Sequence, residues 1–286
     1  MLWQMLRIEH LKLYRRRALW IEVALVAGLI AVVFGIILIA LQFEQVPAAE
    51  RQMVADLLAW PNGVRISILL ASHQMLGGLL MIVLVGMVVA QEYTWQTFTL
   101  AVRAGVPRSV VLISKFVTVL GPALLITATA MLAGAIMSGI VTLNAGGGLD
   151  IGGLPVGELL RDILRVAYAL LPYIALTFLV AVWTRSLAAS LGLVAGYLFL
   201  VEGIVPQLLI MFGGFAAQIG MHMPGQLASA LINANGPFAV MEAGPSPQAS
   251  PFPAAAPEVA VVGIALYTVI FLVLAVLRFR DQDLTA

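Results

Sequence analysis

The chain has 286 residues, of which 62% are hydrophobic and only 10% charged, with a formal net charge of +1 and a mean hydropathy of +1.05. Soluble domains carry about 25% charged residues, so this composition excludes a chain that keeps its whole surface in water and indicates an integral membrane protein. The absence of cysteine excludes disulfide bonds, zinc–thiolate sites and thiol catalysis.

The first predicted element is an interfacial helix within residues 1–18. In the stretch LWQMLRIEHLKLYRRR, residues 2 to 17, apolar side chains fall broadly along one helical side and basic side chains lie elsewhere. This pattern favours a helix that lies in the cytoplasmic interface of a membrane, with its basic side towards anionic headgroups.

Six apolar runs are long enough to cross a bilayer, and they lie at about 19–43, 66–90, 110–140, 163–183, 187–209 and 259–277. The first run is far longer than the roughly 7–15 apolar residues of a signal peptide, so we expect it to be retained as a transmembrane helix. Only Thr184, Arg185 and Ser186 separate the fourth run from the fifth, which predicts antiparallel neighbours. Gly121-Pro122 predicts a bend in the third run.

The distribution of Lys and Arg predicts the orientation. With the N-terminus in the cytoplasm, four basic residues lie outside, namely Arg51, Arg65, Arg161 and Arg165. Eleven lie inside, namely Arg7, Lys12, Arg15, Arg16, Arg17, Arg103, Arg108, Lys115, Arg185, Arg278 and Arg280. This positive-inside bias predicts a multi-pass protein of the cell inner (cytoplasmic) membrane with both termini in the cytoplasm.

The connections on the outer side differ in length. Residues 44–64 and 143–162 are predicted to be short polar connections, whereas the external segment 203–258 is longer. Its first half is predicted to form short helices that dip into the outer leaflet or pack over the bundle, because helix breakers interrupt an apolar sequence at Pro206, Gly213, Gly214 and Pro224. Its second half, GPSPQASPFPAAAP, has the composition of an exposed loop.

The stretch QEYTWQTFTLAVRAGVPRSVVLISK, residues 91 to 115, is much longer than a turn between two membrane helices requires. Thr94 is suited to cap a short helix that ends near Gly105, and Pro107 suits the first turn of the next span. Such a cytosolic helix, with the aromatic Trp95 exposed, is suited to docking in a groove of a partner protein. The chain has no G-x-x-x-x-G-K-[ST] phosphate loop, so any ATP-driven process requires a separate ATPase chain.

These residues carry a family resemblance. E-Y-x-W-x-T, the R-x-G-V-x-R that follows it and Lys115 resemble the permease subunit of type-2 ABC transporters, most of which are exporters. The likeness continues in the N-terminal basic helix, which resembles the family's elbow helix, and in VAVWTRSLAAS (180–190), MPGQLASAL (223–231) and LRFRDQDL (277–284). Two positions depart from the family pattern: Gln96 stands where Gly is usual, and Thr99 where a basic residue is common.

The resemblance implies an all-α integral membrane permease, a single domain over residues 1–286 with six transmembrane helices and a cytosolic coupling segment at 91–109 between helices 2 and 3. In the family this segment seats in a cleft of the ATPase subunit. That role carries over onto Glu92, Tyr93, Thr94, Trp95, Thr97, Arg103, Gly105 and Arg108. The resemblance further implies a second permease copy or a related permease, a lipid bilayer as surroundings and no nucleic acid. Mg-ATP would bind the partner ATPase, and this chain would be no enzyme and hold no cofactor.

Polar side chains within the predicted spans are candidates for a pathway or gate that hydrophobic or amphipathic cargo would cross. They are His73 and Gln74 in the second span and Glu202 in the fifth. The alternatives are an interhelical hydrogen bond for His73 and Gln74, and an ion pair with Arg65 or Arg165 for Glu202.

Two further groups have competing interpretations. Glu22, near the inner end of the first span, is predicted to pair with an arginine rather than to bind cargo. Met221-His222-Met223, with Met211 and Met241, offers soft ligands for copper(I), and adaptable packing by methionine is the alternative.

Other classes of function stay open at this point. An autonomous secondary transporter or channel would have charges deep in the spans or helices broken at the midplane. A non-transporting membrane scaffold could use the same fold. An intramembrane enzyme would need a convergent catalytic set in the spans, and no Ser–His–Asp, paired-carboxylate or His-x-Glu zinc set is visible in the sequence.

Overall fold

The computed structural model describes residues 2–43, 47–73, 75–150, 155–234 and 255–282, and these residues form helices and connections without a β-strand. In chain order the helices are α1 (Leu2–Tyr14), α2 (Arg17–Ala40), α3 (Ala48–Leu58), α4 (Asn62–Leu70), α5 (Leu76–Thr94), α6 (Thr97–Arg103), α7 (Arg108–Asn144), α8 (Val156–Ala169), α9 (Leu171–Thr184), α10 (Leu187–Gly196), the π-helical turn η1 (Tyr197–Val201), α11 (Glu202–Phe212), α12 (Gly214–Met221), α13 (Pro224–Asn233) and α15 (Pro257–Arg280).

Six helical segments of the described residues are long and apolar enough to cross a membrane: α2, α5, α7, α8 with α9, α10 through α11, and α15. The α3–α4 pair also passes this test when taken together, but it is bent by 76°, so it is a broken seventh span or a re-entrant loop. These features confirm an all-α architecture with about six candidate spans.

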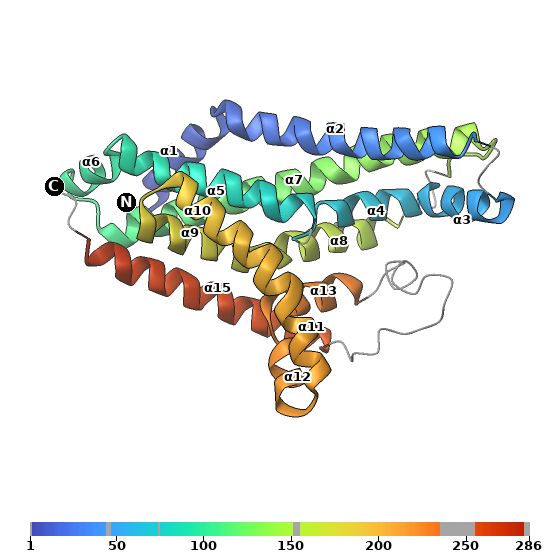
Figure 1. Ribbon diagram of the computed structural model, residues 1–286. Helices are drawn as coiled ribbons and strands as arrows, with labels where there is room; N and C mark the ends of the chain where they lie inside the picture. Colours follow the sequence, from blue (N-terminus) through green and yellow to red (C-terminus); the bar gives the residue numbers. More distant parts are fainter. Residues whose placement is uncertain (1, 44–46, 74, 151–154, 235–254, 283–286) are drawn as a thin grey trace.

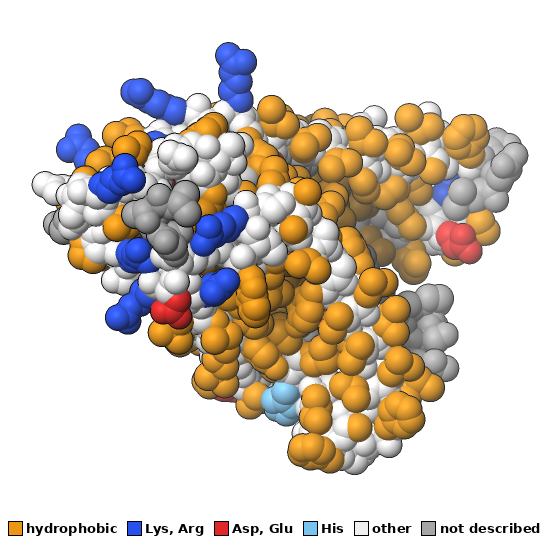
Figure 2. All heavy atoms as spheres, turned by 60° about the vertical axis from the view of Figure 1, so that its left-hand side comes forward, with side chains coloured by type: hydrophobic (Ala, Val, Ile, Leu, Met, Phe, Trp, Pro, Cys, Tyr) orange, Lys and Arg blue, Asp and Glu red, His pale blue; other side chains and the backbone are white. Residues whose placement is uncertain are grey.

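The long helices lie side by side in an elongated bundle (Figure 1). One end of the bundle carries α1, α6 and the C-terminal end of α15, and the opposite end carries α3. Helices α11 and α12 project away from the bundle as an arm. We call the end with α6 the basic end, because exposed Lys and Arg side chains gather there (Figure 2).

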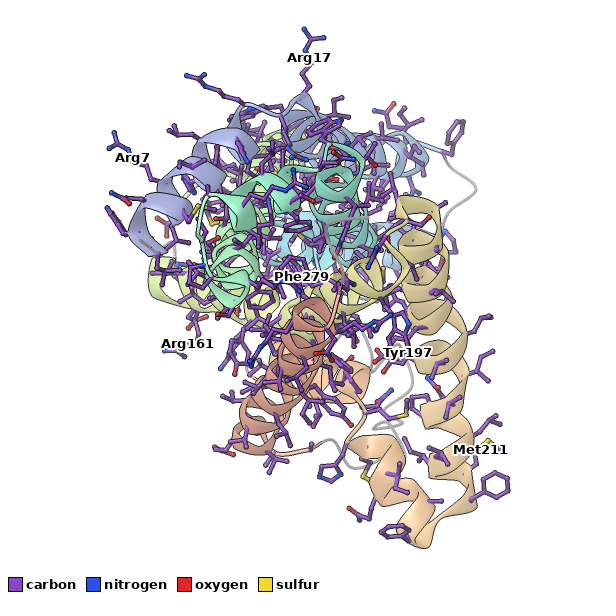
Figure 3. The ribbon with its side chains drawn as sticks, turned by 90° about the vertical axis from the view of Figure 1, so that its left-hand side faces the viewer. Arg7, Arg17, Arg161, Tyr197, Met211 and Phe279 are labelled. Carbon is purple, nitrogen blue, oxygen red and sulfur yellow. The ribbon has the colours of Figure 1, made fainter. Side chains whose placement is uncertain are left out.

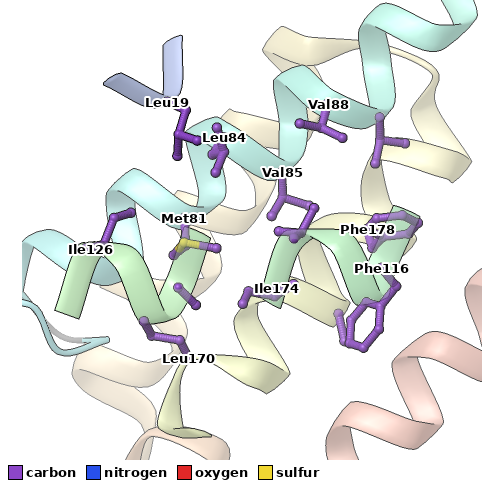
Figure 4. Close-up of a cluster of buried hydrophobic side chains, with 14 of the residues drawn as sticks. Leu19, Met81, Leu84, Val85, Val88, Phe116, Ile126, Leu170, Ile174 and Phe178 are labelled. Carbon is purple, nitrogen blue, oxygen red and sulfur yellow. The ribbon is translucent and has the colours of Figure 1, made fainter. Parts of the chain in front are cut away.

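The core forms where α5, α7 and α9 pack together (Figure 4). Met81 and Val85 of α5 meet Phe116 and Ile126 of α7 and Phe178 of α9 in this cluster, and all five side chains are buried. Helix α7 has 37 residues and runs through Pro122 as one continuous helix. Because lipid provides no hydrophobic drive between helices, such packing contacts are the main force that holds a bundle together.

The second predicted span, 66–90, is wrong as a continuous helix. Helix α4 ends at Leu70 and α5 begins only at Leu76. At this break the chain folds back so closely that a Cβ at Gly77 would overlap the carbonyl oxygen of Ala71, and a Cβ at Gly78 would overlap that of His73. Hydropathy is averaged over a window of residues and therefore does not detect such a close approach of two backbone segments. The two glycines allow this approach because they have no Cβ.

The two connections that were predicted to lie outside are more helical than predicted. Residues 44–64 contain α3, and residues 143–162 contain the first half of α8. The prediction treated the charged residues of these stretches as signs of a solvated connection, but several of them are paired with one another. Arg65 Nη2 lies 2.7 Å from Glu158 Oε2, and Arg65 Nε lies 3.1 Å from Asp162 Oδ2. This pairing joins α4 to α8 and allows the fourth span to begin earlier than residue 163.

Two other predictions are confirmed. Helices α9 and α10 are packed neighbours joined by Arg185, in left-handed conformation with φ 53°, and by Ser186, whose hydroxyl accepts a hydrogen bond from the Ala189 amide. The first half of segment 203–258 forms short helices, namely α11, α12 and α13; α11 continues the candidate span that begins at Leu187, and α13 packs against α15 and α8. The predicted exposed loop falls mostly outside the described residues.

Candidate functional site

Segment 91–109 contains a short helix, α6, as predicted, and the chain leaves it through Gly105 with φ 83°. Its start differs from the prediction. Helix α5 continues through Thr94, whose hydroxyl donates to the Ala90 carbonyl at 3.4 Å, so Thr94 does not cap α6. Gln96, with φ 53°, makes the turn between the two helices instead. Pro107 precedes the first turn of α7 rather than lying in it.

The residues predicted to couple to an ATPase fall into two groups. The exposed ones are Thr94, Trp95, Arg103 and Gly105. The buried or half-buried ones, which make contacts inside the chain, are Glu92, Tyr93, Thr97 and Arg108. Trp95 is 58% exposed, and Leu100, which the sequence prediction did not include, is 62% exposed on α6. An exposed apolar side chain therefore lies in the middle of α6, and an exposed aromatic side chain lies in the turn directly before it.

Glu92 belongs to a buried ion cluster, which we define as Glu9, Arg16, Glu92 and Lys115. Lys115 Nζ lies 2.5 Å from Glu9 Oε2 and 3.0 Å from Glu92 Oε1, and the Lys115 side chain is 1% exposed. Arg16 Nη2 lies 3.3 Å from Glu92 Oε1. The Thr97 hydroxyl donates to Glu92 Oε2. The ion cluster thus joins the base of α6 to α1, α5 and α7.

A second attachment holds the C-terminal end of α15. Arg108 Nη1 donates to the carbonyl oxygens of Arg280 at 2.6 Å and Gln282 at 2.7 Å. The Gln282 side chain accepts from the Tyr93 hydroxyl at 2.9 Å and donates to the Val182 carbonyl at 2.7 Å. Tyr93 and Arg108 therefore link the segment around α6 to α9 and α15. We call these contacts the C-terminal clamp.

Sequence reasoning missed Glu9 and Gln282. Glu9 lies in an amphipathic helix, where a charged residue is normally solvated, and Gln282 follows the last span in a polar tail. Their partners lie 106 and 189 residues away along the chain. No local pattern signals such pairs.

The basic end surrounds α6 with positive charge (Figure 2). The exposed Lys and Arg residues among the segments that meet there are Arg7, Lys12, Arg15, Arg17, Arg103, Arg185, Arg278 and Arg280. Figure 3 shows Arg7 and Arg17 pointing outward from this end. The Arg16 guanidinium lies over the Trp95 ring, 5.4 Å from its centroid. The surface thus combines an apolar, aromatic centre with a basic rim.

The second candidate site brings together two of the predicted pathway residues. His73 is 1% exposed and Glu202 is 6% exposed, and both contact Tyr173. The His73 and Tyr173 rings stack with centroids 5.3 Å apart, and the Tyr173 hydroxyl donates to Glu202 Oε2. Gly225 packs so closely that a Cβ there would overlap the same carboxylate oxygen. We call this group the Tyr173 site. Gln74 lies outside the described residues.

Irregular backbone surrounds the Tyr173 site. His73 lies in the break between α4 and α5, and Glu202 follows the π-helical turn η1 directly. Gly225 lies in the first turn of α13, after Pro224. π-Helical turns are frequent at functional sites, and non-helical backbone at membrane depth is tolerated where protein buries it or a cavity adjoins it.

The structure corrects two predicted polar partners. The interhelical hydrogen bond of His73 stays a prediction: neither ring nitrogen has a partner in strict hydrogen-bond geometry among the described residues, but the Gly225 backbone of α13 lies close to the ring. Glu202 binds Tyr173 rather than Arg65, which pairs with residues of α8. Glu22 is buried, and neither of its carboxylate oxygens has a hydrogen-bond partner in the described part of the chain, so its predicted arginine pair is wrong.

The copper(I) hypothesis stays a prediction. His222 Nδ1 lies 2.7 Å from the Gln218 carbonyl, and Met221 and Met223 on either side of it are half-buried. Met211 is 75% exposed near the end of α11, and Met241 lies outside the described residues. Over the described ranges no group of three His, Asp or Glu side chains could hold a metal ion.

Comparison of the chain with known proteins shows which protein family it belongs to. No curated protein matches this chain. The family described as Protein of unknown function (DUF2705) matches residues 62–285, which include α6, the C-terminal clamp and the Tyr173 site but not α1. Since the match covers well over half of the 286 residues, the chain belongs to the family described as Protein of unknown function (DUF2705).

Proposed function

We propose that this chain is the membrane-spanning subunit of an ATP-driven transporter of the type-2 ABC kind, in which α6 docks into a cleft of a separate ATPase chain. The observation that carries the proposal is the mounting of α6. Leu100 is exposed on α6 and Trp95 is exposed in the turn that precedes it, while the segment is held by the ion cluster and the C-terminal clamp. A coupling element needs both properties: a surface for the partner and a stiff connection to the spans.

The mechanism is mechanical. Closure of the ATPases on Mg-ATP would displace α6, and Thr97 and Glu92 would pass that displacement to Lys115 of α7 and Arg16 before α2. Arg108 would carry it to the end of α15. Transport then requires that two conformations differ in affinity for a hydrophobic or amphipathic cargo, which would pass between this chain and a second copy or a related permease. In this proposal the basic end faces the cytoplasm, the membrane is the inner membrane, and the direction is export.

A second candidate is an autonomous secondary transporter. The break between α4 and α5, the bent α3–α4 pair and the buried Glu202 are the features that favour it. They are compatible with the first proposal as well, because a permease also needs a pathway.

The deciding experiment is gentle purification of the tagged chain from its native host, with mass spectrometry of all proteins that co-elute. We expect a stoichiometric ATPase that carries a phosphate-loop motif. Should the chain purify alone, and should coexpression with neighbouring ATPases recover no complex, α6 is no coupling helix and the autonomous transporter is favoured.

Trp95→Ala is expected to weaken association with that ATPase about thirtyfold, or ~2 kcal/mol, because an exposed aromatic at the centre of an interface is a typical hot spot. The affinity can be measured by interferometry with the detergent-solubilised chain immobilised. Trp183→Ala is the matched control, since Trp183 is 64% exposed and lies beside Arg278 near the end of α15. Wild-type affinity of Trp95→Ala would remove the turn before α6 from the interface.

A further inference from the structure

Glu202 is a buried carboxylate that has no cationic partner in the described part of the chain. It is 6% exposed, and no Lys or Arg of the described residues lies within ion-pair distance of it. Oε2 accepts from Tyr173, whereas Oε1 has no partner in hydrogen-bond geometry, although the Tyr197 hydroxyl lies nearby. Burying a carboxylate in a membrane span is unfavourable, so such a group marks a functional site by default.

Tyrosines from three elements surround this carboxylate at different ranges: the Tyr173 hydroxyl of α9 donates to it, the Tyr197 hydroxyl of η1 lies near it, and Tyr267 of α15 lies within electrostatic reach. Figure 3 shows Tyr197 at the base of the arm, on the side that faces α15. Tyrosine faces attract organic cations through the negative potential of the ring. The surroundings of Glu202 therefore combine one negative charge with aromatic groups, and they favour a cationic ligand over a neutral or anionic one.

An apolar groove of about 580 Å³ adjoins these groups. It is lined mainly by Leu227 of α13 and by Val262, Gly263, Leu266, Tyr267 and Ile270 of α15. Two residues connect it to Glu202. Tyr267 lines the groove and also lies within electrostatic reach of the carboxylate. Leu227 lines the groove from α13, the helix whose first turn also places Gly225 on the carboxylate.

We propose that the groove and Glu202 together form a binding site for an amphipathic organic cation. The apolar body of the ligand lies in the groove along α15, and its cationic group turns inward past Tyr267 towards Glu202. One such molecule would supply the cation that Glu202 lacks and would fill the apolar groove. That the bound molecule is the transported cargo rests on the proposed function, whereas binding itself does not.

The test uses the full chain in lipid nanodiscs of zwitterionic composition, without an ATPase. The probes are tetraphenylphosphonium and tetraphenylborate, which have the same shape and opposite charge. We expect saturable binding of tetraphenylphosphonium above that of empty nanodiscs, and no saturable binding of tetraphenylborate. Glu202→Gln keeps an acceptor for Tyr173 but removes the charge, and it is expected to weaken tetraphenylphosphonium binding about tenfold or more.

Two further variants control this result. Glu258→Gln removes the other carboxylate of the site, which lines the groove itself; because this carboxylate is exposed and its charge is screened by solvent, the variant is expected to change the affinity less than about twofold. Val262→Trp fills the groove from an exposed position, 67% exposed in the free chain, without touching Glu202, and is expected to weaken binding as much as Glu202→Gln.

Three outcomes overturn the proposal: similar binding of both probes, loss of binding in Glu258→Gln but not in Glu202→Gln, or full binding by Val262→Trp. Should Glu202→Gln aggregate, Val262→Trp and the opposite-charge probe decide. Because no ATPase is present, these outcomes are independent of the co-purification experiment. Tetraphenylphosphonium binding by a chain that recruits no ATPase would sustain the site and reject the ABC proposal.

Discussion

Replacing Lys115 with methionine is expected to lower the free energy of unfolding by about 3–5 kcal/mol, because removal of one partner leaves buried charges without compensation. Lys115 is the shared cation of Glu9 and Glu92, both buried, at 2.5 Å and 3.0 Å. The free energy can be measured by denaturant titration in detergent micelles, followed by circular dichroism.

The matched control is Lys12→Met. Lys12 also pairs with Glu9, at 3.3 Å, but its side chain is 42% exposed, so the loss is expected to stay within about 1 kcal/mol. Adding Glu9→Gln to Lys115→Met is expected to restore part of the loss, since Arg16 then remains to neutralise Glu92. If Lys115→Met and Lys12→Met destabilise equally, the ion cluster is not the buried connection described above.

Gly77→Ala is expected to destabilise the fold by about 3 kcal/mol or more, the upper range for overpacking. The added methyl group would overlap the carbonyl oxygen of Ala71, which is backbone and has no rotamer by which to move away. The break between α4 and α5 would have to open, and His73 within it would shift from Tyr173. The same unfolding titration measures the effect.

Gly28→Ala provides a control of opposite sign. Gly28 lies in α2 with no atom within 4 Å of its Cβ position, so alanine there is expected to stabilise the helix by up to about 1 kcal/mol through its higher helix propensity. A Gly77→Ala protein as stable as the wild type would show that the chain does not fold back at this break.

The candidate sites show which features can be recognised from neighbouring residues and which depend on residues far apart in the chain. Trp95 and Gly105 were found from the sequence, because a polar segment between apolar runs with aromatic, glycine and proline positions is a local pattern. Its start at Gln96 was missed, since residues other than glycine rarely adopt positive φ and nothing in the sequence marks this one. His73 and Glu202 were singled out as polar residues in apolar runs, but their meeting through Tyr173 was not foreseen.

The sequence by itself determined the membrane class, the number of long apolar segments, the tight turn at Arg185 and the short helix before Gly105. These features follow from the composition and order of neighbouring residues, because those determine the free energy of transferring a segment into lipid and the local backbone conformation. Only the tertiary structure decided the broken second span, the ion cluster, the C-terminal clamp and the groove beside Glu202. Each depends on groups far apart in the chain, whose contact is decided by how the helices pack and by which buried charges must be neutralised.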